Sequence, residues 1–321
     1  MSSFAIKIAI FLVLVLGFLE IFFIFRNTDN STYLSPLPDY LTLGKNNQVT
    51  MLDLWFPFFD KPEVQGVDTL ATTAKSALTY DLTTEKVLFE KNPREKLPMA
   101  SLTKIMTAIV SLENPKDDDK YAVIGTDLVG EDSMGLEPDE VLSLNELLHG
   151  LMLPSGNDAS EVLARNSPYG REGFIKAMND KALALGLSDT HFSNPSGLQG
   201  DGEQYTTTYD LLVITRYALE NFPLFAEIVA KPEYLLPAIS THKEFTLISE
   251  TNLLTTYDGV KGVKTGYTPE AGLCLVTFLD YKGHKIIGII LNSENRRMEM
   301  KELLDYSLQE LNIKPPIFRG G

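Results

Sequence analysis

Ser101 and Lys104 are the first pair of residues in this sequence whose types and spacing could support chemistry. They stand at the start of a predicted helix, residues 100–112, and a separation of three residues places both side chains on one face. A serine at a helix N-terminus has a free backbone N–H for an oxyanion, and a neutral lysine one turn on could accept its hydroxyl proton. Burial or a second cation nearby would have to keep that lysine neutral. Alone, the pair is more often a helix cap followed by a surface lysine.

Ser155 and Asn157 form a second candidate pair, separated by a glycine. An apolar segment and Pro154 precede them and a predicted helix, 158–165, follows, so they are expected in a tight turn between two helices. From such a turn the hydroxyl could relay a proton into a cleft, and the amide could hold the backbone of a substrate. Alone, the pair favours the alternative of a polar turn that caps the following helix.

Lys264, Thr265 and Gly266 form a third candidate motif, which Tyr267 follows. The apolar sequence after them predicts that the motif opens or lines a β-strand. Gly266 would let another chain approach closely, so a peptide substrate could add as an extra strand, with the Tyr267 N–H as a second oxyanion donor. Lys264 and Thr265 could bind a carboxylate. The alternative is an ordinary turn.

The three motifs occur in the order Ser-x-x-Lys, Ser-x-Asn and Lys-Thr-Gly, which is the motif set of penicillin-binding proteins and serine β-lactamases. Their surroundings resemble the serine-type D-alanyl-D-alanine carboxypeptidases, the small penicillin-binding proteins that trim peptidoglycan stems. The resemblance covers roughly residues 66–314. It is carried by Pro98–Ala108, Ser155–Ala159, Phe192–Leu198, Tyr205–Thr207, Gly262–Thr268 and Ala271–Val276.

The resemblance implies a role for each motif residue. Ser101 corresponds to the acylated nucleophile, Lys104 to its general base and Ser155 to a proton relay. Arg296 corresponds to a carboxylate ligand, although the adjacent Arg297 leaves that register open. The remaining substrate-binding residues are Asn157 for the substrate backbone, Lys264 and Thr265 for its terminal carboxylate, and Gly266 and Tyr267 on the strand that it joins.

The same resemblance implies a β-lactamase/transpeptidase-like α+β fold. An antiparallel sheet would be flanked by helices, with a helical subregion and the active site between them. The expected reaction is acyl transfer on Ser101 without a metal or cofactor: the terminal D-alanine leaves and water hydrolyses the ester. The implied partners are peptidoglycan pentapeptide stems as substrates and β-lactam antibiotics as inhibitors.

Three alternatives use the same motifs. A peptidoglycan DD-endopeptidase would need the same site residues. A class A β-lactamase is less favoured, because no Glu-x-x-Leu-Asn segment occurs between Asn157 and Lys264. A non-catalytic wall-binding protein would keep the fold, but the intact Ser101, Lys104, Ser155 and Lys264 argue against it, because binding alone requires no neutral lysine.

The elements that must position these motifs alternate between strands and helices. Residues 76–81 and 86–90 predict a hairpin around a Thr83-Thr84 turn, and 272–279 and 285–291 predict another. Helices are expected at 144–152 after a Ser143/Glu146 capping box, and at 158–165, 172–185, 208–221 and 296–311. Strands at both ends with helices between them indicate one α+β catalytic domain over 66–314 and a short tail, 315–321.

The N-terminal region predicts a membrane anchor. Residues 8–25 are apolar apart from Glu20 and are marginally long enough to span a bilayer, so 1–26 are interpreted as an anchor or uncleaved signal. A cleaved signal and a buried helix are the alternatives. Residues 27–65 are interpreted as a tether, in which 55–59 either lie at the membrane interface or pack on the domain. The implied function, rather than the flanking charges, predicts a catalytic domain outside the membrane.

Composition excludes several other classes. The 321 residues carry a formal net charge of −15, which disfavours general nucleic-acid binding. Cys274 is the only cysteine, so no intrachain disulfide can form, and the four histidines lack the spacing of a metal site. Cys274 and His149 are both expected in the core.

Overall fold

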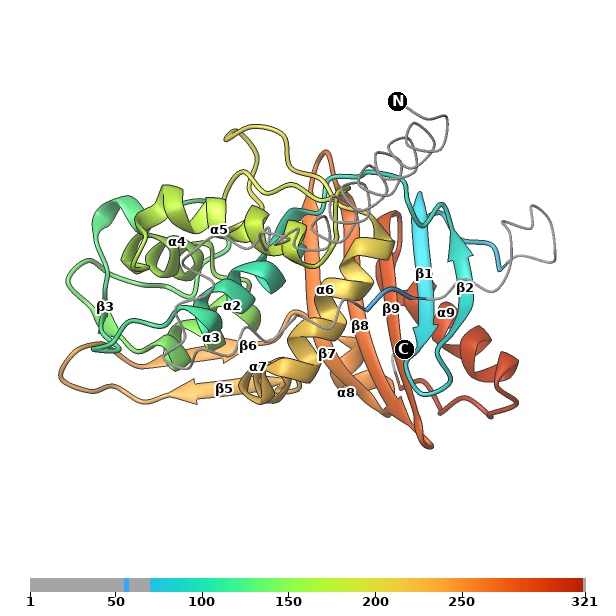
Figure 1. Cartoon of the computed structure of the whole chain (residues 1–321). Helices are drawn as coiled ribbons and strands as arrows, with labels where there is room; N and C mark the ends of the chain where they lie inside the picture. The colour runs from blue at the N-terminus through green and yellow to red at the C-terminus, as the bar shows by residue number, and fades with distance from the viewer. Residues whose placement is uncertain (1–54, 58–69, 320–321) are drawn as a thin grey trace, which may run out of the picture. The chain divides into compact units, whose positions relative to one another are not determined.

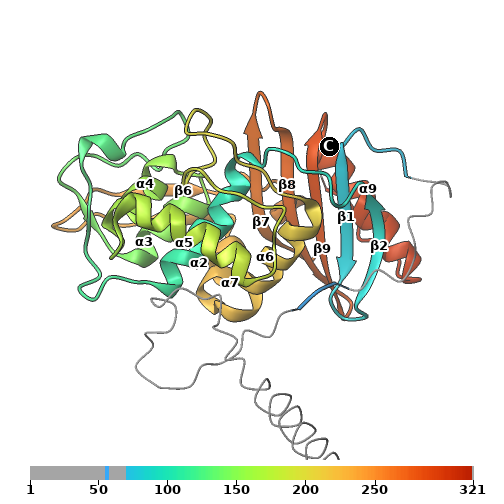
Figure 2. The same cartoon turned by 45° about the horizontal axis from the view of Figure 1, so that its top comes forward.

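A computed structural model describes residues 55–57 and 70–319 of the chain (Figure 1). They form a five-stranded antiparallel sheet flanked by helices, with a largely helical subregion beside it (Figures 1 and 2). The expected α+β arrangement is therefore confirmed.

The main sheet joins the two ends of the described chain. Its strand order is β2-β1-β9-β8-β7, so the first hairpin pairs with the last strand and β7 is the outermost strand on its side. The strands are β1 (Ser76–Asp81), β2 (Lys86–Lys91), β7 (Val260–Thr268), β8 (Gly272–Tyr281) and β9 (His284–Ser293). Placing β7 at an edge leaves one side of the Lys-Thr-Gly strand unpaired within this sheet, which suits the addition of a peptide.

Both predicted hairpin turns are confirmed. The Asp81 carboxylate accepts hydrogen bonds from the Thr83 N–H at 3.1 Å and the Thr84 hydroxyl at 2.7 Å, which holds the first turn. In the second, Lys282 and Gly283 both have positive φ, 49° and 85°. Two consecutive positive φ values match the right-handed twist of the flanking strands.

Two helices cover opposite faces of the sheet (Figures 1 and 2). Helix α9 (Arg296–Glu310) buries Met300, Leu303 and Leu304 in one cluster with Ile286 and Ile290 of β9. Side chains alternate along a strand, so the intervening β9 residues face α6 (Thr208–Asn221) on the other side. The central strand β9 is thus buried on both faces, and β8, which pairs with it, carries β7 on its other side.

The remaining elements form the helical subregion. Its α2 helix is buried from Thr103 to Ser111 and runs through its centre (Figure 2). The Ser143/Glu146 capping box is present at the start of α3. The other elements are η2 (Ala100–Leu102), α2 (Thr103–Glu113), β3 (Tyr121–Ala122), η3 (Gly125–Asp127), β4 (Val141–Leu142), α3 (Leu144–Met152), α4 (Asn157–Asn166), α5 (Gly170–Ala184), α7 (Pro223–Val229), β5 (Glu233–Leu236), β6 (Phe245–Ile248) and α8 (Leu253–Thr256).

Only part of the predicted N-terminal region is described. The rings of Trp55 and Tyr80 of β1 pack edge to face, with their centroids 5.4 Å apart. The Arg216 guanidinium lies 4.4 Å from the centre of the Trp55 ring. Residues 55–57 thus pack on the domain, which is one of the two expected outcomes. The predicted anchor and most of the tether lie outside the described residues, and no helix within 55–57 and 70–319 is long and apolar enough to cross a bilayer.

Candidate active site

The three sequence motifs meet around one cavity of about 420 Å³. Ser101 lies in the 3₁₀ turn η2 just before α2, Ser155 lies in the turn before α4, and Thr265 lies on β7. The full lining is Ser101, Asp132, Ser155, Glu250, Asn252, Thr265, Gly266, Tyr267 and Arg296. Lys104, Asn157 and Lys264 are buried next to these residues, so the site lies between the sheet and the helical subregion, as expected.

Two glycines allow the chain around Ser101 to lie between β7 and a loop. A Cβ at Gly266 would stand 3.0 Å from the Met99 carbonyl oxygen, and one at Gly197 would stand 2.0 Å from that of Ala100. Gly197, whose φ is 88°, therefore requires glycine, and a side chain at Gly266 would force the Met99 carbonyl oxygen to move by a few tenths of an ångström. The close approach predicted at Gly266 exists, but the segment that approaches is the protein's own residues 99–101 rather than a separate peptide.

Lys104 is fully buried and has three polar partners. Its Nζ lies 2.7 Å from Asn157 Oδ1, 2.7 Å from the Ser196 carbonyl oxygen and 2.9 Å from Ser101 Oγ. Burial, and secondly the positive charge of Lys264, hold the pKa of Lys104 well below its ordinary value. A neutral amine has two N–H donors and one lone pair. In the neutral form those donors would serve Asn157 and Ser196 and the lone pair would face the Ser101 hydroxyl, whereas a protonated amine would donate to all three oxygens.

Ser155 occupies a constrained turn. Its φ is 64°, its side chain is buried, and its Oγ has no hydrogen-bond partner among the described residues. The next residue, Gly156, donates its N–H to the Gly150 carbonyl oxygen at 2.9 Å, and the Asn157 N–H donates to the Asp132 carbonyl oxygen at 2.8 Å. The turn is therefore held by its backbone while the hydroxyl on the cavity wall stays unpaired.

Lys264, Thr265 and Arg296 gather at the other side of the cavity. Lys264 is buried and donates to the Thr265 carbonyl oxygen at 3.1 Å, and burial lowers its pKa to about 8. Arg296 donates from Nη1 to the Gly266 carbonyl oxygen at 2.7 Å and lines the cavity. Arg297 does not line this cavity but lines a smaller neighbouring one. The structure thus brings Arg296, of the two adjacent arginines, to the cavity that holds Ser101.

Several residues of the site were not identified from the sequence. Glu250 and Asp132 line the cavity from loops, and Ser196 contributes only its carbonyl oxygen to Lys104. Asp158 binds the backbone N–H groups of Met134 and Leu136, each at 3.0 Å, which fixes the loop that carries Asp132. Ser196 lies within Phe192–Leu198, one of the segments that resemble the carboxypeptidase family. Its contact with Lys104 is made by a backbone carbonyl oxygen, which every residue type carries, so the residue type does not reveal it.

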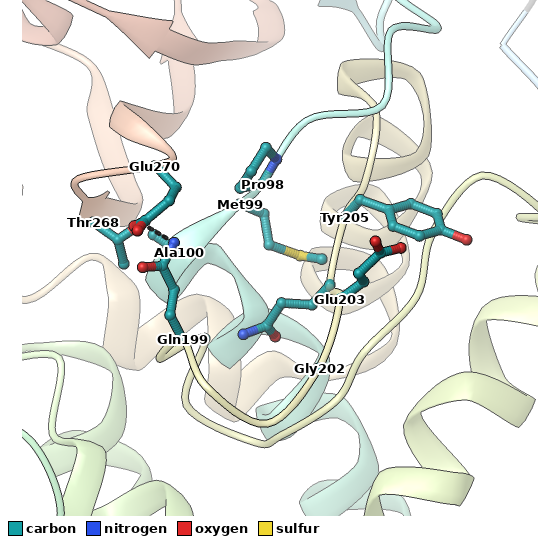
Figure 3. A pocket seen from close by; sticks show the side chains of 11 residues that line it. Pro98, Met99, Ala100, Gln199, Gly202, Glu203, Tyr205, Thr268 and Glu270 are labelled. Carbon is teal, nitrogen blue, oxygen red and sulfur yellow. Dashed lines mark hydrogen bonds between the residues drawn. The ribbon is translucent and has the colours of Figure 1, made fainter.

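A second pocket of about 310 Å³ borders the same two segments of the chain (Figure 3). Its walls include Pro98, Met99 and Ala100, which precede Ser101, and Thr268, which follows Tyr267. The facing loop contributes Gln199, whose Nε2 lies 3.4 Å from the Thr268 hydroxyl. A chain that leaves the first cavity along β7 would reach this pocket.

The two expected core residues are confirmed. Cys274 is fully buried in β8, and the buried thiol has its pKa raised to about 11 by burial. His149 is buried in α3 and stacks on Tyr234 at 3.9 Å. Neither lines the cavity that holds Ser101.

Comparison with known proteins agrees with this geometry. The D-alanyl-D-alanine carboxypeptidase DacF of Bacillus subtilis strain 168 is 34% identical over 269 residues, which are 80% of this chain and 68% of that protein. The structure of the Streptomyces K15 DD-transpeptidase superposes with a TM-score of 0.70 at 29% identity and covers 76% of this chain and all of its own. The ampicillin-bound penicillin-binding protein D2 of Listeria monocytogenes gives 0.64 at 30% identity, over 75% of this chain and 99% of its own.

The family itself follows from the sequence profile. The profile of the D-alanyl-D-alanine carboxypeptidases matches residues 63–295, which is most of the chain and includes all three motifs. The chain therefore belongs to the D-alanyl-D-alanine carboxypeptidase family and is a serine-type carboxypeptidase that acts on D-Ala-D-Ala.

Proposed function

We propose that Ser101 is the residue that carries this activity. Its Oγ attacks the carbonyl carbon between the two D-alanines while Lys104 takes the hydroxyl proton, and the terminal D-alanine then leaves with a proton on its nitrogen. Water hydrolyses the resulting ester and frees Ser101. The observation that carries the proposal is the position of Lys104 Nζ, fully buried and 2.9 Å from Ser101 Oγ, where burial and the charge of Lys264 lower its pKa and so favour the neutral amine that can take the proton.

The other residues around the cavity bind the substrate in this proposal. The backbone N–H groups of Ser101 and Tyr267 stabilise the oxyanion, each contributing roughly 10²–10³ in rate. The unpaired Ser155 hydroxyl relays the proton to the leaving nitrogen. Asn157 binds Lys104 through its amide oxygen and also binds the backbone of the substrate. The terminal carboxylate of the substrate is bound by Lys264, Thr265 and Arg296.

The remainder of the stem peptide has a defined path. β7 is an edge strand, so a peptide can pair along Gly266 and Tyr267. The second pocket lies at the end of this path and is large enough for further stem residues (Figure 3). β-Lactams would acylate Ser101 from the same position, by analogy with the ampicillin-bound Listeria protein.

The location of the enzyme follows from its substrate. Peptidoglycan lies outside the cytoplasmic membrane, so we propose that residues 8–25 anchor the chain and that the catalytic domain is extracytoplasmic. The apolar sequence of this segment supports the proposal. Cell fractionation tests it: the full chain should sediment with membranes, and the chain lacking residues 1–26 should not.

Defined muropeptides test the proposed function. The full-length protein is incubated with a mixture of monomers that end in D-Ala-D-Ala and cross-linked dimers, and the products are read by mass. We expect the monomers to lose one alanine. Intact monomers with split dimers would identify an endopeptidase, and an unchanged mixture would identify a non-catalytic wall-binding protein.

Substitution of Lys264 tests the electrostatic part of the proposal. Lys104 acts as a base only when neutral, and the positive charge of Lys264 lowers the pKa of Lys104. Lys264→Met removes this repulsion and raises that pKa, so the acid limb of kcat/KM against pH should move to higher pH. The measured quantity is the pH at which the acid limb falls, not the maximum value of kcat/KM, because Lys264 also binds the substrate in this proposal.

A nearby lysine provides the control. Lys261 lies on the same strand but is exposed, and Lys261→Met removes the same charge. Its acid limb should coincide with that of the unmodified enzyme. A limb that stays in place in Lys264→Met, or moves to lower pH, would contradict the assignment of Lys104 as the base.

A further inference from the structure

The cavity that holds Ser101 contains a carboxylate in an unexpected position. Glu250 lies in the loop between β6 and α8 and lines the cavity, and its backbone N–H donates to the Leu153 carbonyl oxygen at 3.2 Å. Its Oε2 accepts a 2.6 Å hydrogen bond from the Thr265 hydroxyl and lies 3.8 Å from Lys264 Nζ. Burial lowers the pKa of Arg296, and the charge of Glu250 opposes that shift, so Arg296 also lies within its electrostatic reach.

These contacts are the ones assigned above to the carboxylate of the substrate. A carboxylate only accepts hydrogen bonds, and a threonine hydroxyl has a single proton to donate. While Thr265 donates to Glu250, it therefore cannot donate to a second carboxylate. Two carboxylates beside Lys264 would also repel each other.

We propose that Glu250 is a specificity-determining residue that occupies the position of the substrate's terminal carboxylate and competes with it for Thr265. A substrate that ends in a free carboxylate binds only after the Glu250 side chain swings away. A substrate that ends in a neutral group carries no negative charge, so it is not repelled by the Glu250 carboxylate. The inference rests on the proposed function, because it takes Thr265 and Lys264 as ligands of the substrate carboxylate.

The Glu250 side chain has room to move. It is 39% exposed, so one direction leads to solvent. Another leads to a small cavity of about 40 Å³ that Glu250 shares with Arg296 and Arg297. The Nε of Arg297 is buried and has no hydrogen-bond partner among the described residues. A displaced carboxylate can thus approach an unsatisfied donor, which lowers the free energy of the open position.

Two substrates that differ only at the C-terminus test the inference. One is an acylated D-Ala-D-Ala with a free carboxylate, and the other is its C-terminal amide. Steady-state kinetics of the full-length protein give kcat/KM for each, and their ratio measures preference for the carboxylate. Glu250→Gln should raise this ratio roughly tenfold, mainly through a lower KM for the carboxylate substrate, which is the scale of one charge-assisted hydrogen bond.

Further variants separate competition from other effects. Glu250→Ala removes the side chain altogether and should raise the ratio at least as much as Glu250→Gln. Glu85→Gln removes a charge from the exposed β1–β2 turn and should leave the ratio unchanged. Glu250→Asp keeps the charge but shortens the reach to Thr265, so its ratio should lie between those of the unmodified and Gln enzymes.

Thr265→Val distinguishes the inference from the function on which it rests. The variant lacks the hydroxyl, so the proposed function predicts a lower ratio. If Thr265→Val lowers the ratio and Glu250→Gln leaves it unchanged or raises KM for the carboxylate substrate, the inference is wrong and the proposed function stands. If Thr265→Val leaves the ratio unchanged, Thr265 does not bind the carboxylate and both assignments are wrong.

Discussion

The Ser101→Ala protein is expected to form no covalent adduct with penicillin and to release no D-alanine from stem peptides. The substitution removes the hydroxyl that lies 2.9 Å from Lys104 Nζ, so the proposed nucleophile is no longer there to form the ester. Loss of the nucleophile from a serine peptidase lowers kcat by about 10⁴-fold or more. Labelling with a fluorescent penicillin, followed by mass measurement of the intact protein, reads the adduct directly, and D-alanine release reads turnover.

A buried serine on the helix that follows Ser101 serves as the control. Ser111 is buried in α2, and its hydroxyl has no partner among the described residues. Ser111→Ala removes an equivalent group without breaking a hydrogen bond, so labelling and turnover should both stay within about twofold. Residual labelling of Ser101→Ala that ampicillin competes away would show that another residue is acylated.

The sequence predicted which motif residues would come together at one cavity, because the geometry within each motif is local. The pairs Ser101/Lys104 and Ser155/Asn157 are fixed by helix and turn geometry over two or three residues, and short motifs record such spacing. Lys264 is fixed by the strand on which it lies, and the apolar sequence after the motif predicted that the motif opens or lines a strand. In these cases residue type, spacing and local structure carry the same information.

Glu250 could not be predicted in the same way. Nothing in its local sequence points to the cavity, because its position depends on how the loop after β6 returns to β7. The contact with Thr265 joins residues 15 positions apart through tertiary structure. Ser196 was equally invisible, since it acts through a carbonyl oxygen that every residue type carries.

The fold shows the same division. The two hairpins of the main sheet were predicted because their side chains alternate and their turns have specific chemistry. The β5–β6 pair was not predicted. Its strands are only four residues each and lie outside the main sheet, and the apolar residues Leu235 and Ile248 are exposed, so the sequence does not alternate between apolar and polar residues as a half-buried strand does. Helix α2 starts at Thr103 rather than at 100, because Ala100 has a φ of 49° and the chain first forms a 3₁₀ turn.

Lys104→Met is expected to abolish acylation while the protein stays folded. A positioned general base contributes about 10²–10⁴ in rate, and no other amine contacts Ser101 Oγ among the described residues. Methionine fills a similar volume and removes the cost of burying an amine, but it leaves Asn157 Oδ1 and the Ser196 carbonyl oxygen without their donor. These effects oppose each other, so the free energy of unfolding should change by no more than about 2 kcal/mol. Urea unfolding measures stability, and stopped-flow penicillin labelling measures acylation.

Substitution of another buried lysine should have the opposite effects, a loss of stability without a loss of acylation, and therefore serves as the control. Lys181 of α5 is nearly inaccessible and pairs with Glu113 at 2.7 Å, away from the cavity. Lys181→Met leaves that carboxylate without its cation, which should lower the free energy of unfolding by about 3 kcal/mol and leave the acylation rate of the folded fraction unchanged. If both variants lose acylation equally, the loss reports a general requirement for buried lysines. If only Lys104→Met loses it, and does so without matching destabilisation, the amine acts on the Ser101 proton, because no structural role separates rate from stability in this way.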